Sequence, residues 1–437
     1  MSDVTSDNVS NASSSSDAPV LIIGGGLAGL ACARTLEGAG RACTLFEAGS
    51  EVGGRVKTDA VGGYLLDHGF QIYLDSYPQG QHFFSHEGLA LRTFEPGAMV
   101  KMHGHAKPQR LVDPFRRPGS LVATALSAAA GVGDKWKVAQ LRRHVAGKSL
   151  EDLLAVKQQS TLDFLREFGF SDRVIDNFFR PFYGGITLDR ELTVSSRFFL
   201  WSFKLFGSGN ACLPSAGMAA LPRQISSRLR KTEIRTKTEI RRVDGSAVIT
   251  AGGQRVQGSA VVVAAEAPAA AELLRMSGYD PEPAVPVARK QTATLYFTAD
   301  ESPFADKLIL LAAEGVAAPI NSVAVLTNVA PSYAPAGKTL MSVSVVDADA
   351  FGDDLEDKVQ SALPQLVGEL AGLEHLKTYR IDYALPDQAP PALDPPHADP
   401  WLDDHVLLAG DYCDTASING ALQSGRRAAE AVLNRKA

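Results

Sequence analysis

The apolar positions near the N-terminus begin with a pattern typical of a buried strand. Residues 20–23 read VLII, a continuous apolar run of the kind that is covered on both faces of a sheet. A helix is predicted over residues 27–36, with Gly38 or Gly40 as its stop. A second apolar run, residues 42–46, ends in Glu47. The order strand, helix, strand predicts a parallel βαβ unit and an α/β fold.

Three glycines stand between the first strand and the helix. Gly24, Gly26 and Gly29 form the pattern G-x-G-x-x-G, which permits a tight turn, the approach of a pyrophosphate to the backbone, and close packing of helix on strand. The N–H groups at the start of the helix favour the negative charge of that pyrophosphate. Glu47 follows Gly24 by 23 residues, near the spacing of about 20 expected of an acid that binds the adenosine ribose. Together these features predict a Rossmann-like dinucleotide-binding unit.

Two further motifs decide which dinucleotide is expected. Gly53 and Gly54 precede Arg55, so that two glycines permit a close approach and a guanidinium group suits phosphate oxygens. Near the other end of the chain, residues 406–412 read VLLAGDY, and a helix is predicted over 422–433. These motifs resemble those of the flavin amine oxidase superfamily, which includes monoamine oxidases, protoporphyrinogen oxidase and the carotene desaturases. The string AGDY is most similar to the desaturases.

The resemblance implies FAD as the cofactor. It also implies a Rossmann-like FAD-binding domain of the GR2 type, interleaved with an α+β substrate domain. Relatives with a thioether-linked flavin carry a cysteine in the region that corresponds to residues 385–400. This chain has none there, so FAD is predicted to be held without a covalent bond. The predicted cofactor-binding residues are Gly24, Gly26, Leu27, Ala28, Gly29, Glu47, Ala48, Gly54, Arg55, Gly69, Phe70, Ile240, Gly410, Asp411, Ile418 and Ala421.

The segment DHGFQ, residues 67–71, resembles the part of the family that passes the isoalloxazine ring. His68 in this segment is a tempting catalytic residue, but a lone histidine is more often a hydrogen-bonded structural residue. The sequence therefore does not identify a catalytic residue, and we predict no metal site.

The predicted domains alternate along the chain. We expect a disordered tail over 1–18, an FAD-binding domain over 19–75, 212–285 and 401–437, and a substrate-binding domain with a helical cap over 76–211 and 286–400. Strands are predicted over 233–243, 247–250 and 256–265 in the first domain. In the second, an antiparallel sheet is predicted from 292–298, 322–327 and 340–346.

Composition narrows the class of protein. The net charge of −6 argues against a nucleic-acid partner. The four cysteines show no metal-binding or disulfide spacing, which indicates free thiols in a reducing compartment, and we expect a cytoplasmic protein. No stretch reaches the roughly 18 apolar residues that a membrane span needs.

The basic stretch, residues 101–148, carries ten Lys or Arg but only two acidic residues, Asp113 and Asp134, around an apolar run over 121–131. Such a pattern suits peripheral contact with an anionic membrane. The alternative, a solvated face of the helical cap, is somewhat favoured.

Aromatic residues are dense over 178–206, where strings such as FFRPFY suit the lining of a site for an apolar substrate, although most of them are expected to pack in a core. Family amine oxidases carry a lysine on a strand beside the flavin, where this chain places Thr292 with Lys290 nearby. We therefore favour desaturation or dehydrogenation of an apolar, isoprenoid-like substrate, with oxygen or a quinone-like molecule as electron acceptor. Two alternatives stay open: a flavin amine oxidase, and a non-catalytic module that binds prenyl groups or lipids, like the related GDP-dissociation inhibitors.

Overall fold

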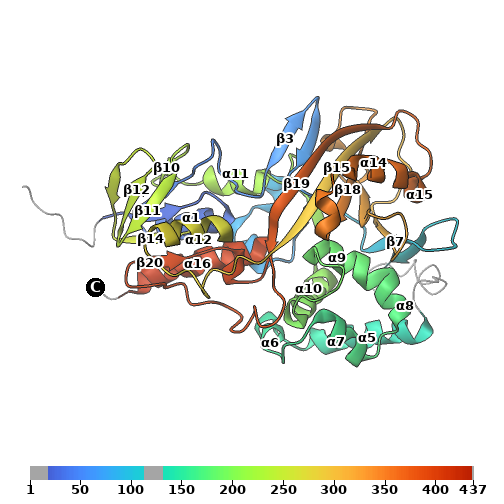
Figure 1. Cartoon of the computed structure of the whole chain (residues 1–437), viewed down its shortest axis with the longest axis horizontal. Coiled ribbons are helices and arrows are strands. Elements are labelled where there is room, and N and C mark those ends of the chain that lie inside the picture. The colour runs from blue at the N-terminus through green and yellow to red at the C-terminus, as the bar shows by residue number, and fades with distance from the viewer. Residues whose placement is uncertain (1–17, 113–130, 436–437) are drawn as a thin grey trace, which may run out of the picture.

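The computed structural model describes residues 18–112 and 131–435. The predicted tail over 1–17 and the part of the basic stretch over 113–130 lie outside the described residues. The glycine motif belongs to a parallel sheet at one end of the molecule (Figure 1). The apolar runs predicted as strands form the centre of this sheet. Its order is β10 (Glu233–Arg235), β2 (Cys43–Phe46), β1 (Val20–Ile23), β14 (Ala260–Val263) and β20 (Val406–Leu408).

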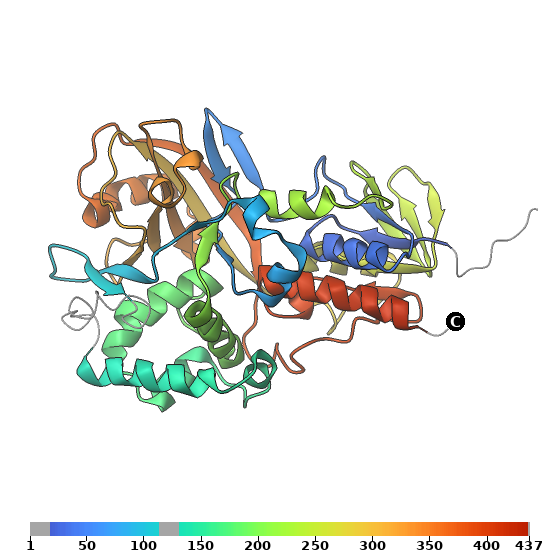
Figure 2. The ribbon, with the colours of Figure 1, turned by 180° about the vertical axis from the view of Figure 1, so that it is seen from behind.

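Helices cover both faces of this sheet because its strands are apolar on both sides. Val20, Ile22 and Val262 face α1 (Leu27–Gly38) and α16 (Ile418–Asn434). Leu21, Ile23 and Val261 face α12 (Ala267–Met276). The first and last helices of the unit lie side by side (Figure 2). They approach so closely that a Cβ atom on Gly425 would lie 2.0 Å from the carbonyl oxygen of Ala28.

The single strand predicted over 233–243 is wrong, because the structure divides it between two sheets. Its first part is β10, and its second part is β11 (Ile240–Asp244), which forms an antiparallel sheet with β12 (Ala247–Thr250) and β13 (Arg255–Gln257). The chain turns between them at Lys237, whose φ is +52°. The N–H groups of Lys237 and Thr238 bond to the carbonyl oxygens of Gly49 and Glu47. Tertiary hydrogen bonds therefore override the local strand pattern.

The predicted strand over 256–265 is likewise shorter than expected. Its start belongs to β13, and β14 begins only at Ala260. Between them, Gly258 lies against β1, since a Cβ atom there would be 2.6 Å from a side-chain carbon of Leu21.

The second sheet has seven strands and is antiparallel apart from the pair β16–β7. It contains the three strands predicted for the substrate domain, and four strands that the sequence did not single out extend it at both edges. Its order is β19 (Glu374–Pro386), β15 (Arg289–Ala299), β18 (Thr339–Val346), β17 (Ser322–Val325), β16 (Ile309–Ala312), β7 (Gly97–Lys101) and β8 (Gln109–Val112). Helices α14 (Leu355–Ala362) and α15 (Pro364–Val367) add apolar side chains to its core.

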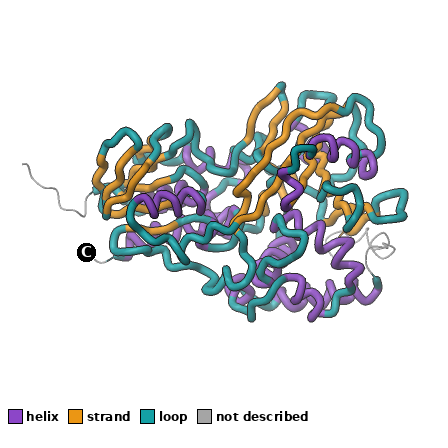
Figure 3. Tube along the Cα trace, viewed as in Figure 1, coloured by secondary structure: helices purple, strands orange, loops and turns teal. Residues whose placement is uncertain are grey.

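A helical lobe lies beside this sheet, and in Figure 3 it is the cluster of purple helices separated from the orange strands. It consists of α5 (Val132–Ala146), α6 (Leu150–Leu154), α7 (Thr161–Phe168), α8 (Asp172–Val174), a π-helical turn (Ile175–Phe179), α9 (Arg180–Thr187) and α10 (Ser196–Ser208). Short elements connect the lobe and the sheets: β3 (Thr58–Val61), β4 (Tyr64–Asp67), β5 (Tyr73–Leu74), β6 (Arg92–Thr93), β9 (Ala211–Leu213), α2 (Pro78–Phe83), α3 (His86–Leu89), α11 (Ala220–Ser226) and α13 (Leu326–Val329).

The α/β fold with a Rossmann-like unit is confirmed, and the chain crosses repeatedly between the two sheets. The residue boundaries of the predicted domains stay predictions. Within the described ranges, no helix is both long enough and apolar enough to span a bilayer.

Candidate functional site

A cavity of about 1270 Å³ extends from the carboxyl ends of β1, β2 and β20 into the helical lobe. Ligands of parallel α/β sheets bind at this edge. Apart from Gly29, which lies beneath the turn, all of the predicted cofactor-binding residues line the cavity. Motifs near residues 24, 54, 69 and 411 of the chain thus lie around one space, although the contacts of each with FAD stay predictions.

Two glycine turns form the floor of the cavity. Gly24 has a φ of +108°, and a Cβ atom there would lie 2.6 Å from the carbonyl oxygen of Ala264. The turn at Gly54, with a φ of +58°, lies against the first turn, since a Cβ atom on Gly54 would be 3.1 Å from Cα of Gly26. A side chain at Gly54 would fill the space between the turns, and one at Gly24 would collide with the backbone that follows β14. The two turns therefore leave a narrow backbone cradle that fits a pyrophosphate.

Glu47 ends β2 beside this cradle. Its two carboxylate oxygens accept hydrogen bonds from the backbone N–H groups of Gly25, at 2.8 Å, and Gly49, at 2.7 Å. Each oxygen keeps a further lone pair for another donor. The carboxylate is therefore fixed in place and keeps lone pairs for further donors, and its contact with the ribose stays a prediction.

An ion pair joins the two distant motifs. Arg55 donates one hydrogen bond to Asp411, at 2.7 Å, and one to the carbonyl oxygen of Ala384, at 2.6 Å, and its guanidinium lies 5.1 Å from the ring centroid of Tyr383. Only 4 % of Asp411 is exposed. Burial by itself would lower the pKa of Arg55, but the Asp411 carboxylate raises it above its usual value. Arg55 thus stays charged within its ion pair, and its guanidinium lines the cavity where phosphate oxygens are expected.

The N-terminus of α16 opens onto the same cavity. Ser417 caps this helix by accepting a hydrogen bond from the N–H group of Gly420, at 3.0 Å. Ile418 and Ala421 of its first turn line the cavity. The positive end of a helix dipole at this position stabilises negative charge on a bound ligand.

The segment predicted to pass the flavin ring crosses to the second sheet. Gly69 has a φ of +92°, and the N–H group of Phe70 bonds to the hydroxyl of Thr294 on β15, at 3.1 Å. His68 bonds to Asp59, at 2.9 Å, and its ring lies 4.5 Å from that of Tyr379. These contacts fit the interpretation of His68 as a hydrogen-bonded structural residue.

Asp67 at the start of this segment is a buried carboxyl, with 2 % of the residue exposed. It accepts hydrogen bonds from the Thr58 hydroxyl, at 2.5 Å, the Met218 N–H group, at 2.9 Å, and the Tyr333 hydroxyl, at 3.0 Å. Burial outweighs these contacts and raises the pKa of Asp67 to about 6.

We expect Asp67→Asn to change how stability depends on pH. The pKa of Asp67 is higher in the folded state than in the unfolded state, so its favourable contribution is full below about pH 4 and is lost as the pH rises through about 6. We therefore expect the free energy of unfolding of the wild type, measured by chemical denaturation, to fall by roughly 2–3 kcal/mol between pH 4.5 and 8. The variant should not show this fall. Equal pH profiles of the two proteins would contradict this assignment.

The control is Asp59→Asn, because the contribution of Asp59 to stability should depend on pH with the opposite sign. Burial opposes ionisation there, but contacts with Lys377, Tyr379 and His68 lower the pKa of Asp59 below its usual value. The contribution of Asp59 is therefore lost as the solution is acidified through that lowered pKa.

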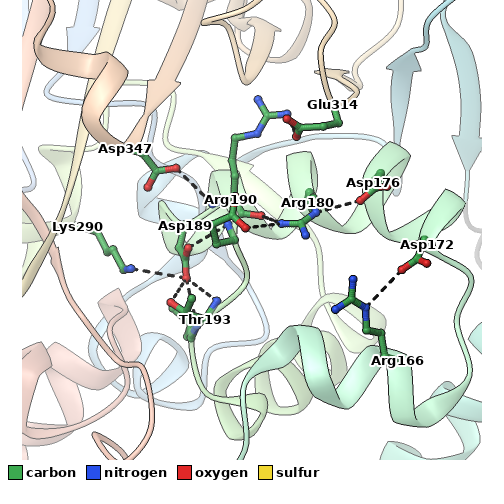
Figure 4. Close-up of polar contacts among 12 residues, drawn as sticks. Arg166, Asp172, Asp176, Arg180, Asp189, Arg190, Thr193, Lys290, Glu314 and Asp347 are labelled. Atoms are coloured by element: carbon green, nitrogen blue, oxygen red, sulfur yellow. Dashed lines mark hydrogen bonds and ion pairs between the residues drawn. The ribbon is translucent and has the colours of Figure 1, made fainter.

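Lys290 is held in a charged cluster and is not among the residues that line the cavity. Its Nζ lies 3.6 Å from Asp189 (Figure 4) and 3.4 Å from Asp387. Asp189 is itself buried and accepts hydrogen bonds from the N–H and hydroxyl groups of Thr193. A shift of register between Lys290 and Thr292 separates the two side chains, and Thr292 lines the cavity. That Thr292 stands where family amine oxidases carry their lysine stays a prediction.

The far end of the cavity is aromatic, and most of its rings also pack in the core of the helical lobe. The lining rings come from the π-helical turn, α9 and α10, and include Phe178, Phe182, Phe198, Phe203 and Phe206. Sequence reasoning missed Tyr383 and Glu266 beside Arg55, and Gln388 beneath α16. None of them belongs to a local motif, and only the tertiary structure brings them to the site.

The class of protein follows from comparison with known families. A sequence model of the family described as flavin containing amine oxidoreductase matches residues 27–433. The chain therefore belongs to this family and is an FAD-dependent oxidoreductase. The backbone cradle, Glu47 and the Arg55–Asp411 pair fit this cofactor, which accepts hydride when it is bound.

Solved structures share the fold over nearly the whole chain. A putative protoporphyrinogen oxidase from Exiguobacterium sp. 255-15 has a TM-score of 0.70 at 18% identity, with 97% of this chain and 100% of that chain covered. An oxidoreductase from Methanosarcina mazei has a TM-score of 0.72 at 18% identity, with coverage of 95% and 100%. Putrescine oxidase bound to putrescine has a TM-score of 0.66 at 17% identity, with coverage of 96% and 99%. At these identities, the similarity establishes the fold alone.

Proposed function

We propose that this protein desaturates or dehydrogenates an apolar, isoprenoid-like substrate. The observation that carries the proposal is the continuity of the cavity from the cofactor cradle into the aromatic helical lobe. A long apolar molecule can bury most of its surface there, and burial of apolar area contributes about 25 cal/mol per Å². FAD, held by the backbone cradle, Glu47 and Arg55, would supply a hydride acceptor for one substrate C–H bond. Loss of a proton from the neighbouring carbon would leave a double bond, and oxygen or a quinone-like acceptor would take the two electrons.

The chain contributes position and shape to this reaction. Thr292, Ser322 and Ser344 line the cavity where the second sheet faces it, and none of them carries a charge at neutral pH. Aromatic walls exclude water and hold the substrate against the cofactor. Orientation of this kind accounts for a large part of a rate enhancement without a dedicated protein base.

Amine oxidation is the second candidate, and the match to the family described as flavin containing amine oxidoreductase favours it. The position of Lys290 counts against it, because two carboxylates hold that ammonium outside the cavity. A non-catalytic module that binds prenyl groups or lipids is the weaker alternative, since the cofactor cradle is intact.

Anaerobic mixing with candidate substrates tests the proposal. The oxidised flavin bands should bleach with partly saturated polyenes and persist with simple amines such as putrescine. Bleaching by amines alone would replace the proposal with amine oxidation. A protein that stays colourless after incubation with FAD would favour the binding module.

We also propose that the helical lobe rests on an anionic membrane. Trp136 on α5 is 62% exposed, Lys137 lies beside its ring, at 5.9 Å, and the exposed Arg143 follows one heptad later. Val138 of the same helix lines the cavity, so an apolar substrate could pass from the bilayer at this wall. An exposed indole beside cations suits the interface of a bilayer with anionic headgroups.

Flotation with vesicles tests this contact. The wild type should float with phosphatidylserine-containing vesicles, and Trp136→Ser should reduce the bound fraction several-fold. Leu433→Ser, at an exposed apolar position at the end of α16, is the matched control and should float normally. No flotation with either anionic or neutral vesicles would exclude the proposal.

A further inference from the structure

Gln388 lies at the start of two helices that wall the cavity. Only 3 % of this residue is exposed, and it belongs to the connection that follows β19. Its backbone carbonyl accepts a hydrogen bond from the N–H group of Ser195, at 2.9 Å, and Ser195 is the N-cap of α10. Its side-chain Nε2 donates to the carbonyl oxygen of Asp414, at 2.6 Å, and its Oε1 accepts from the N–H group of Ala416, at 2.9 Å. One residue thus contacts both the N-cap of α10 and the loop that leads into α16.

The loop over 414–416 packs directly against the first turn of α16. The N–H group of Ser417, the N-cap, bonds to the carbonyl oxygen of Thr415, at 2.7 Å. A Cβ atom on Gly420 would lie only 1.9 Å from that same carbonyl oxygen, so loop and helix are in direct contact. A displacement of the loop therefore displaces the helix N-terminus that opens onto the cavity.

The same connection is attached to the helical lobe at further points. His397 lies between Asp414, at 2.8 Å, and Glu151 of α6, at 3.0 Å. Arg197 of α10 is buried and donates a hydrogen bond to the carbonyl oxygen of Leu393. Residues 388–397 therefore form a strap between the helical lobe and the loop before α16.

We propose that Gln388 is a positioning residue, which sets the N-terminus of α16 against the bound cofactor and couples it to α10 in the helical lobe. The positive end of α16 favours the negative charge of reduced flavin, so its position affects the reduction potential. A molecule that moves α10 as it fills the aromatic end of the cavity would act on that potential through the strap. The inference rests on FAD binding, which family membership establishes, and it does not depend on the proposed apolar substrate.

The test is Gln388→Met, a substitution of similar size that removes both side-chain hydrogen bonds. FAD binding to the flavin-free protein is titrated by flavin fluorescence, and the potential of the bound flavin is measured against a reference dye. We expect FAD to bind about tenfold more weakly, because two buried backbone groups lose their partner. We also expect the affinity for reduced relative to oxidised flavin to fall severalfold. A tenfold fall corresponds to about 30 mV for a two-electron couple.

Gln158→Met is the matched control. Gln158 donates to the Ser195 hydroxyl, at 3.2 Å, and so contacts the same N-cap of α10 but not the loop over 414–416. The reduction potential of flavin bound to the Gln158→Met variant should equal that of the wild type. If Gln388→Met lowers the melting temperature but leaves the potential unchanged, the residue is merely structural and the proposal is overturned. A wild type that binds no FAD would instead refute the cofactor assignment.

Gln388→Glu gives a second readout that does not depend on the stability of the Met variant. A protonated carboxyl group can still donate to the carbonyl of Asp414 and accept from the N–H group of Ala416, whereas a carboxylate cannot donate. The difference in potential between this variant and the wild type should therefore be small at low pH and grow as the pH rises. A difference that does not change with pH would contradict the assigned hydrogen bonds.

Discussion

Gly29→Ala is expected to abolish FAD binding. Its new Cβ atom would lie 2.0 Å from the carbonyl oxygen of Gly24, well inside van der Waals contact, and that oxygen belongs to the backbone of the cofactor turn. To relieve the clash, either α1 moves away from β1 or the turn changes shape, and both changes disrupt the cradle. We expect protein purified without bound flavin and a fall in stability of about 3 kcal/mol or more. The ratio of flavin to protein absorbance and the melting temperature measure these two effects.

The control for this variant lies in the same helix. Gly38 is exposed in the last turn of α1, and the nearest atom to a Cβ there is the end of the Arg34 side chain, at 3.7 Å. The Gly38→Ala variant should bind FAD normally. Its free energy of unfolding should rise by up to about 1 kcal/mol, because alanine restricts the unfolded chain and favours the helix. If Gly29→Ala retained its flavin, the close packing of α1 on the turn would not be needed for binding.

Arg55→Met is expected to weaken FAD binding by at least about 100-fold, since removal of one partner leaves a buried charge unpaired. Asp411 would keep its carboxylate beside the cavity, with no cation to offset the repulsion of a pyrophosphate. Arg55→Lys should be intermediate, because an ammonium restores the charge without the two-pronged geometry that contacts both Asp411 and Ala384. Fluorescence titration of the flavin-free proteins gives the dissociation constants.

Arg426→Met separates this effect from the loss of an ordinary ion pair. Arg426 pairs with Glu430 one turn along α16, at 2.7 Å, and both side chains are partly exposed. Such pairs contribute about 0.3–0.5 kcal/mol, so the variant should bind FAD like the wild type. Unchanged affinity of the Arg55→Met variant would show that the pair joins the two motifs without contributing to cofactor binding.

The local sequence was sufficient to predict the cofactor end of the molecule. The run over 20–23, the three glycines and Glu47 are close in sequence, and their backbone requirements are strict, so they identify the turn and the helix that follows. The Asp411 motif was also recognisable by itself. Its contact with Arg55, 356 residues away in the chain, was not predicted, because no local property of either residue specifies the other.

The sequence was less informative wherever hydrogen bonds between distant segments decide the structure. The pattern over 233–243 reads as one strand, but bonds from Lys237 and Thr238 to the β2 segment divide it between two sheets. Lys290 and Thr292 are two residues apart on one strand, so alternation alone places both on the same face. The shift of register between them separates the two side chains.

By itself, then, the sequence determined the nucleotide-binding unit, because short-range steric and charge requirements leave a pattern that can be read along the chain. Its resemblance to a known family added the cofactor. Only the tertiary structure decided that the cradle continues into an aromatic cavity, that carboxylates from two other segments hold Lys290, and that Gln388 joins the starts of α10 and α16. These features depend on contacts between residues that are far apart in the chain. Such contacts are selected by packing and by the need to satisfy buried polar groups, and neither leaves a local signal in the sequence.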